Sequence, residues 1–124
     1  MIYLDTHVVA WLYAPRLDLL SEAARQALEE NEILISPVVL LELDYLHEIG
    51  RIARPSTDIY QDLHETLGLR LCTRGFAEVI RAACAETWTR DPIDRIIVGH
   101  AAAAGRPLVT RDETIRAHYG RTLW

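Results

Sequence analysis

Four acidic residues stand at positions where a carboxylate needs a physical reason. Asp5 ends the short apolar segment MIYLD, and Asp112 follows the segment RPLVT. Glu42 lies inside the apolar run SPVVLLELDYL, and Asp94 lies near the start of DPIDRIIVGHAAAAG. If the fold gathers these side chains, they form a negative pocket that a cation would stabilise. The four acids therefore favour metal-dependent phosphodiester chemistry as the leading hypothesis.

Glu42 is the most informative of the four, because it is surrounded by apolar residues. On a helix, its neighbours three and four positions away are Val38, Val39, Tyr45 and Leu46. The carboxylate therefore emerges within the apolar stripe of that helix. An unpaired buried carboxylate costs several kcal/mol, so Glu42 must be paired with an arginine, protonated or bound to a cation. A buried ion pair stays open as the alternative to metal binding.

The three aspartates also have a simpler explanation as helix caps. Asp5 is placed to cap a helix that begins at Thr6, and Asp112 is placed to cap a short helix that follows it. Asp91 and Asp94 form an N-cap and third-position pair, which stabilises a helix start without any function. Capping does not exclude metal binding, because helix N-termini in doubly wound folds point towards the ligand crevice.

Binding of divalent cations would give these acidic residues a role in catalysis. Mg²⁺ and Mn²⁺ prefer hard oxygen ligands, and carboxylates near substrate phosphates are their usual protein sites. Such ions activate a bound water and stabilise the leaving oxygen in phosphodiester hydrolysis. Thr6 and Thr110 adjoin acids in the sequence, and their hydroxyls are candidates for holding the attacking water or a ligand carboxylate.

Arginines near the acids are the candidate phosphate-binding residues. Arg90, Arg95 and Arg111 flank the acidic positions, and their competing role is to pair with those same acids. The aromatic candidate Trp11 shares helical spacing with His7 and Val8, which favours core packing over base stacking.

The elements that must position these residues alternate between strands and helices. Strands are expected at residues 2–5, 33–36, 69–72 and 107–110, with a last edge strand at 121–124. Helices are expected at 6–13, from the cap Ser21 to 29, 37–49, from the cap Ser56 to 67, 76–87 and 92–104, with a short one after Asp112. This alternation predicts an α/β fold with a mostly parallel central sheet of four to five strands flanked by helices on both faces.

Length and composition limit the class of protein. The 124 residues fit one domain, expected to span 1–124, and no repeat or linker divides them. The longest apolar stretches fall well short of a membrane span, and no leader pattern is seen, so a cytoplasmic protein without a membrane partner is expected. The net charge of −5 argues against a broad basic nucleic-acid surface, although all 13 basic residues are arginine.

Three segments together carry a resemblance to a known family. The segments are IYLDTHVVAWL, ISPVVLLELDYLHEIGRI and DPIDRIIVGHAAAAGRPLVTRDETI. With them the chain resembles PIN-domain ribonucleases, specifically VapC-type toxins of bacterial toxin–antitoxin modules. The resemblance covers nearly the whole chain. One departure is TWTRDPIDR, where many members of that family carry histidines just before the DPxDR segment.

The resemblance implies a set of functional residues and partners. The acids Asp5, Glu42, Asp94 and Asp112 match the family's metal-site acids, and Asp91 matches the accompanying acid of the DPxDR segment. The implied activity is Mg²⁺- or Mn²⁺-dependent endoribonuclease cleavage that leaves 5′-phosphate and 3′-hydroxyl ends. The implied partners are an RNA substrate, a second copy of the chain and a VapB-like antitoxin that covers the acid pocket.

Other protein classes that gather acids in a similar fold fit less well. A receiver-type phosphoacceptor domain requires a lysine, and this chain has none. A haloacid-dehalogenase-type phosphatase requires a second aspartate two residues after the first, where this chain has His7. The remaining alternative is a PIN fold kept as an interaction module without catalysis, and the presence of all four acids argues against it.

Overall fold

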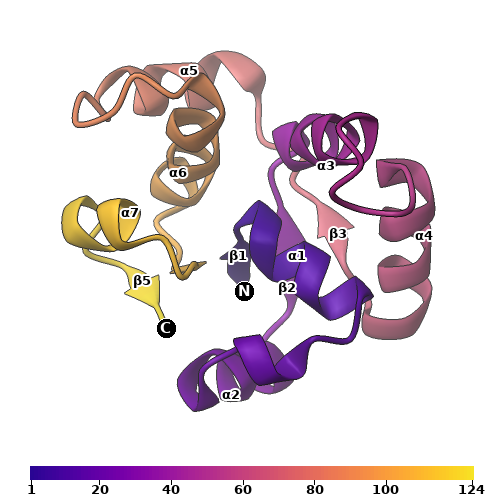
Figure 1. The fold of residues 1–124 in the computed structure, drawn as a ribbon. Coiled ribbons are helices and arrows are strands. Elements are labelled where there is room, and N and C mark those ends of the chain that lie inside the picture. Colours follow the sequence, from indigo (N-terminus) through magenta and orange to yellow (C-terminus); the bar gives the residue numbers. More distant parts are fainter.

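A five-stranded parallel sheet forms the centre of the protein, seen here in a computed structural model that describes residues 1–124 (Figure 1). The strands are β1 (Ile2–Leu4), β2 (Ile33–Ile35), β3 (Arg70–Leu71), β4 (Leu108–Val109) and β5 (Thr122–Leu123). Their order in the sheet is β3-β2-β1-β4-β5, and every neighbouring pair is parallel. β1 is therefore the central strand, and all of its residues are buried.

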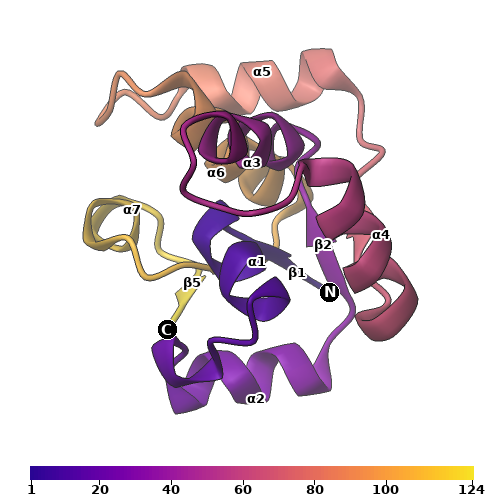
Figure 2. The same ribbon diagram turned by 45° about the vertical axis from the view of Figure 1, so that its right-hand side comes forward.

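Helices connect the strands and cover both faces of the sheet. They are α1 (Thr6–Tyr13), a short 3-10 helix η1 (Leu17–Leu19), α2 (Glu22–Glu30), α3 (Val38–Glu48), α4 (Ser56–Leu67), α5 (Phe76–Cys84), α6 (Pro92–Ala104) and α7 (Glu113–His118). Right-handed crossovers place α1 to α4 on one face and α5 to α7 on the other (Figure 2). The α/β architecture expected from the sequence is confirmed. None of the helices combines the length and apolar character that a membrane span requires.

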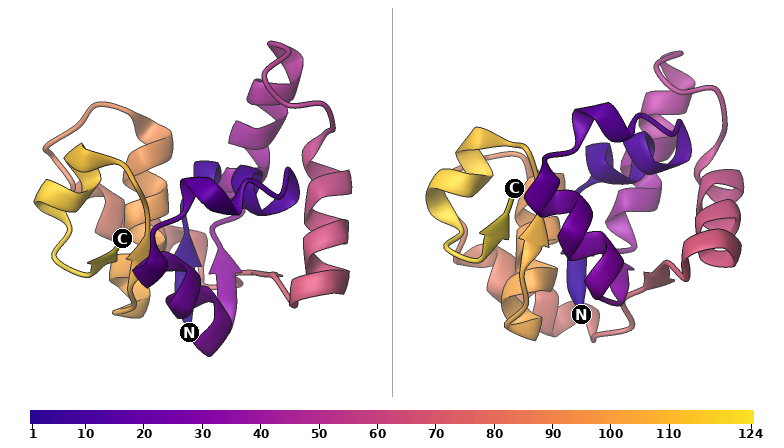
Figure 3. Two further views of the ribbon diagram at one scale, coloured as in Figure 1. Left: turned by 60° about the horizontal axis from the view of Figure 1, so that its bottom comes forward. Right: turned by 90° about the horizontal axis from the view of Figure 1, so that it is seen from below.

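The strand order creates one place where a crevice must open. The chain moves from β1 outwards to β2 and β3, then returns across the sheet to β4 and β5 on the other side of β1. The connections after β1 and β4 therefore leave in opposite directions, and ligands bind at such points in open α/β sheets. Asp5 follows β1 there, and its N–H donates to the carbonyl of Val109 at the end of β4 (3.0 Å). In Figure 3, α3 projects past this carboxyl end of the strands.

Side chains cap the starts of α1, α2, α6 and α7, whereas α3, α4 and α5 begin without a side-chain cap. Ser21 caps α2 as expected, since its hydroxyl accepts from the Ala24 N–H (3.0 Å). The prediction that Ser56 caps α4 is wrong: Ser56 is the first helical residue, and its own N–H donates to the carboxylate of Asp44 on α3 (2.8 Å). Asp44 thus joins the start of α4 to α3, a contact between positions far apart in the sequence.

The most extensive helix–helix contact joins α5 to α6, the helix that carries Asp94. Gly99 in the middle of α6 lies directly against α5. A Cβ at this position would meet the carbonyl oxygen of Val79 at 2.9 Å and the Cβ of Ala83 at 3.0 Å. The contact includes backbone atoms, which cannot move aside as a flexible side chain can. Only glycine permits this approach of α6 to α5.

Replacing Gly99 should therefore weaken the fold. We expect Gly99→Ala to lower the free energy of unfolding by about 1–3 kcal/mol, because the added methyl forces α6 away from α5. Urea unfolding followed by circular dichroism would measure this change. Gly120→Ala is the matched control, because a Cβ there has no heavy atom within 4 Å. Equal stability of the two variants would contradict the proposed tight packing.

Candidate active site

Asp5 is the most buried acid of the site, with 6% of its surface exposed. It caps α1, where one carboxylate oxygen accepts from the Thr6 N–H (2.8 Å). The other oxygen accepts from the hydroxyl of Thr110 (2.6 Å). Burial raises the pKa of Asp5, and these two hydrogen bonds oppose the rise. The result is a carboxylate fixed in one orientation at the carboxyl end of the central strand.

Asp112 is joined to Asp5 through the hydroxyl of Thr110. That hydroxyl donates to Asp5 and accepts from the backbone N–H of Asp112 (3.0 Å). The Asp112 carboxylate caps α7 by accepting from the Ile115 N–H (2.9 Å). Thr110 is fully buried, whereas Asp112 is exposed. Thr110 therefore positions both acids, as a hydroxyl between two strand-end carboxylates.

Glu42 extends from α3 towards the same region and is half-buried. Burial raises the pKa of Glu42, the Thr6 hydroxyl opposes the rise, and the charge of Asp5 adds to it. Thr6 Oγ1 is buried and lies near the Glu42 carboxylate, but neither that carboxylate nor any other protein atom meets hydrogen-bond geometry with it. A buried hydroxyl with no partner is uncommon. It marks a place where a ligand or an ordered water would complete the hydrogen bonding.

Asp91 and Asp94 bring the start of α6 into the site. Asp91 caps α6, and one of its oxygens accepts from the N–H groups of Ile93 (2.9 Å) and Asp94 (3.2 Å). Burial raises the pKa of Asp94 to about 7. Nearby negative charges also raise it, those of Asp91, Asp5, Glu42 and Asp112 in decreasing order. Asp94 is thus close enough to all the other acids to feel their charge.

The acids share one end of the sheet, but they do not close into a preformed metal cage. No three of the carboxylates are arranged as a ready set of metal ligands. None of the four surface ion pairs in the structure includes a site acid. The buried ion pair that would have explained Glu42 without a ligand is therefore not formed. What remains is a group of mutually repelling carboxylates held by helix caps and threonine hydroxyls.

The three candidate arginines differ in what they contact. Arg90 donates to the carbonyl of Thr87 (2.9 Å). Arg95 donates to the carbonyls of Ala83 (3.1 Å) and Cys84 (3.0 Å), so its guanidinium caps the end of α5. Arg111 makes no hydrogen bond or ion pair within the protein. Of the three, it is the guanidinium left available at the site.

A hollow of about 340 Å³ opens beside the acids, and its lining includes His7 and Trp11, neither of which was expected in the site. Its lining residues are Asp5, His7, Trp11, Arg111, Asp112 and Glu113. The expectation that Trp11 belongs to the core is only half right, because its ring is partly buried and also lines this hollow. His7 lies two residues after Asp5, and its charge lowers the pKa of Asp5 and of Glu42. The sequence feature that could have identified His7 as a site residue is its position in the first turn of the helix that follows Asp5.

Comparison with known proteins identifies the fold family. The family model of the PIN domain matches residues 2–120. The chain belongs to the PIN-domain family. This PIN domain is 33% identical over 123 residues to Ribonuclease VapC22 of Mycobacterium tuberculosis, and the match covers 94% of this chain and 91% of that protein.

Two solved structures share the PIN fold of this chain. A toxin–antitoxin complex from Klebsiella pneumoniae has a TM-score of 0.66 at 17% identity, covering 98% of this chain and 95% of that chain. The structure of VapBC2 from Rickettsia felis bound to a promoter DNA fragment has a TM-score of 0.60 at 20% identity and covers all of both chains. At these identities the likeness establishes the fold.

The raised pKa values predict how the metal-free PIN domain responds to pH. The folded state binds a proton at Asp94 more tightly than the unfolded chain does, so this carboxyl removes stability as the pH rises. The loss begins near the ordinary aspartate pKa of about 4 and is complete above about 7. We expect Asp94→Asn to unfold at a higher temperature than the wild type in EDTA. The difference should grow from about pH 5 to about pH 8.

The wild type must be compared with Asp94→Asn because a buried histidine changes the stability with pH in the opposite direction. Burial lowers the pKa of His100, so this residue removes stability as the pH falls. Subtracting the melting temperature of the wild type from that of Asp94→Asn at each pH cancels this contribution, since His100 is present in both proteins. A difference that does not change with pH would mean that Asp94 titrates as an ordinary surface aspartate.

Proposed function

We propose that this PIN domain is an endoribonuclease toxin that cleaves RNA phosphodiester bonds with a divalent metal ion, Mg²⁺ or Mn²⁺. The observation that carries the proposal is the group of acids at the carboxyl end of β1, where the pKa of Asp94 is raised to about 7. Perturbed acids in a crevice are typical of functional sites. The relative named Ribonuclease VapC22 supports the reaction class.

The residues fit a hard divalent cation. Asp5, Asp94, Glu42 and Asp112 offer carboxylate oxygens, the ligand type that Mg²⁺ and Mn²⁺ prefer. A cation would also relieve the repulsion among them, which no arginine neutralises in the protein. We assign these four as metal-site residues, with Asp91 acting indirectly by holding the start of α6. When bound, the metal would supply an activated water and stabilise charge on the phosphate.

The remaining residues orient the reacting groups. The buried Thr6 hydroxyl has a free hydrogen-bonding capacity beside Glu42, which suits it to hold the attacking water. The Thr110 hydroxyl keeps Asp5 and the backbone of Asp112 in register, so the two strand-end carboxylates stay aligned. Glu42, with its raised pKa, is placed to accept a proton from that water. Arg111 is the guanidinium available for a substrate phosphate.

Protein partners complete the proposal. We infer that the toxin forms a homodimer in the cytoplasm and is inhibited by a VapB-like antitoxin that covers the acid site. The exposed side chains of α3 support a protein-binding surface: Leu41, Tyr45 and Ile49 are spaced four residues apart, and 46%, 47% and 66% of their surface is exposed. Large apolar side chains lined up in this way are typical of interaction sites.

Removing a site acid should abolish cleavage without unfolding the protein. We expect Asp5→Asn or Asp94→Asn to lower the cleavage rate of RNA at least about a hundredfold, because the metal loses a charged ligand. Excess EDTA should have the same effect on the wild type. Sequencing of the RNA ends made by purified protein would show 5′-phosphate and 3′-hydroxyl termini. Growth inhibition on expression should be lost in parallel.

Glu48→Gln is the matched control for an acid on the same helix as Glu42. Glu48 is exposed near the end of α3 and should leave cleavage unchanged, whereas Glu42→Gln should reduce it. The metal mechanism would be excluded if Asp94→Asn cleaved RNA at the wild-type rate, or if the wild type still cleaved RNA in excess EDTA. A wild type that never cleaves RNA would favour a PIN fold used only for interaction.

The apolar surface of α3 gives a separate test of the homodimer. We expect Ile49→Glu to shift the chain towards the monomer in analytical ultracentrifugation, because a charge would be buried at the interface. Glu48→Gln, on the neighbouring position, should leave the assembly unchanged. A dimer of undiminished affinity in Ile49→Glu would show that α3 does not form the interface.

A further inference from the structure

The hollow beside the acids has an aromatic wall that the metal chemistry does not use. Trp11 on α1 lines this hollow together with Asp5 and Asp112. The volume of about 340 Å³ lies in the range of roughly 300–1,000 Å³ in which proteins bind small molecules. An indole ring next to a phosphodiester-cleaving site is suited to stacking on a nucleobase, because every base has a π-face.

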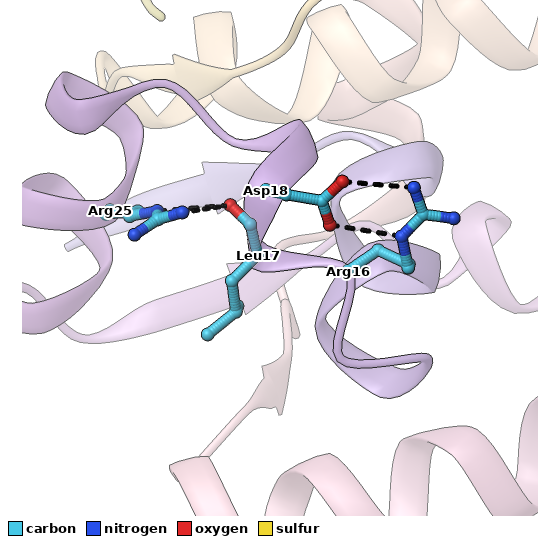
Figure 4. Close-up of polar contacts among 4 residues, drawn as sticks. All are labelled: Arg16, Leu17, Asp18 and Arg25. Carbon is cyan, nitrogen blue, oxygen red and sulfur yellow. Dashed lines mark hydrogen bonds and ion pairs between the residues drawn. The ribbon is translucent and has the colours of Figure 1, made fainter.

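Arg111 stands beside this ring as a cation with no carboxylate partner. Its guanidinium carbon lies 6.0 Å from the centre of the Trp11 ring, a loose cation–π contact. A phosphate that offers bidentate hydrogen bonds would compete well with such a contact. The nearby Asp18 does not neutralise Arg111, because both of its carboxylate oxygens accept from Arg16 (3.0 Å each), as Figure 4 shows.

The surroundings of Arg111 extend the surface beyond a single nucleotide. Arg111 also lines a second hollow, on the side of η1, together with Trp124 and Ser21. The ring centres of Trp11 and Trp124 lie 6.0 Å apart. The segment from Arg16 to Arg25 borders this hollow, and within it Arg25 donates twice to the carbonyl of Leu17 (2.6 and 3.1 Å) (Figure 4). The acids, Trp11, Arg111 and Trp124 thus follow one another along a continuous surface.

We propose that Trp11 and Arg111 form a nucleotide subsite next to the cleavage position. Trp11 stacks on the base adjoining the scissile phosphate, and Arg111 binds the next phosphate along the strand. This inference rests on the proposed ribonuclease function and adds a requirement on the substrate. The base at this position must be unstacked from its neighbours, so the cut falls in a single-stranded segment.

The test removes the base and the ring separately. The starting substrate is an oligoribonucleotide that the wild-type protein cleaves. Two versions of it are made: in one the nucleotide before the cleavage position is replaced by an abasic nucleotide, and in the other the nucleotide after it. For wild-type protein, one of the two replacements should raise KM roughly 5- to 150-fold, the range of one base–aromatic stack. For Trp11→Leu, the same replacement should change KM little, because the stack is already lost. Trp11→Phe keeps an aromatic face and should restore most of the sensitivity.

Two further variants separate this role from a general loss of structure. Trp88→Leu is the matched control: Trp88 stacks on His118 with ring centres 5.0 Å apart, outside the hollow, and its removal should leave the abasic effect intact. Arg111→Gln should make the slope of log affinity against log salt concentration shallower, by the amount that corresponds to about one phosphate contact. Arg111→Lys should retain that contact.

The outcomes distinguish failure of the subsite from failure of the ribonuclease proposal. Equal abasic sensitivity in wild type and Trp11→Leu would overturn the subsite while RNA cleavage remains. If the wild type does not cleave RNA, binding of the same oligonucleotides is measured by fluorescence anisotropy. Abasic sensitivity that depends on Trp11 would then support the subsite, and its absence would overturn it.

Discussion

The confinement of several carboxylates at the carboxyl end of β1 is the constraint to which the surrounding structure is adapted. Their charge is not balanced by arginines. It is balanced by helix N-termini, since Asp5 caps α1, Asp91 caps α6 and Asp112 caps α7. Each helix start presents free N–H groups and roughly half a positive charge. The fold thus holds these three carboxylates in place without an ion pair that a substrate or metal would have to break.

Glu42 and Asp94 are less well compensated, although Asp94 lies in the first turn of α6. Neither accepts a hydrogen bond from a helix N-terminus, and burial raises the pKa of both. Their helices, α3 and α6, meet at this end of the sheet. The packing of α6 on α5 through Gly99 holds Asp94 in this position. Such local conflict, offset by packing elsewhere, is typical of functional sites.

The sequence predicted those features that depend on neighbouring residues. The helix ends expected at 67 and 104 are confirmed, since Gly68 and Gly105 follow them in the left-handed conformation with φ of 73° and 63°, and Asp91 caps α6. Features that depend on distant residues could not be read in this way. Ser56 looks like a cap, but Asp44 reaches its N–H from another helix. Arg95 looks like a phosphate ligand, but the carbonyl end of α5 lies within its reach. The pairing of Thr110 with Asp5 joins positions 105 residues apart.

The sequence also left open whether each aspartate is a cap or a ligand, and the hydrogen bonds show that the two roles are compatible. In Asp91 and Asp112 a single carboxylate oxygen, Oδ1, makes all the cap bonds, which leaves Oδ2 without a protein partner. Asp5 uses both oxygens, one for the Thr6 N–H and one for Thr110. Because each carboxylate oxygen has two acceptor positions, Asp5 still has one left on each. Asp5 is therefore the most rigidly oriented of the acids, and the cap that fixes it also aims its remaining lone pairs.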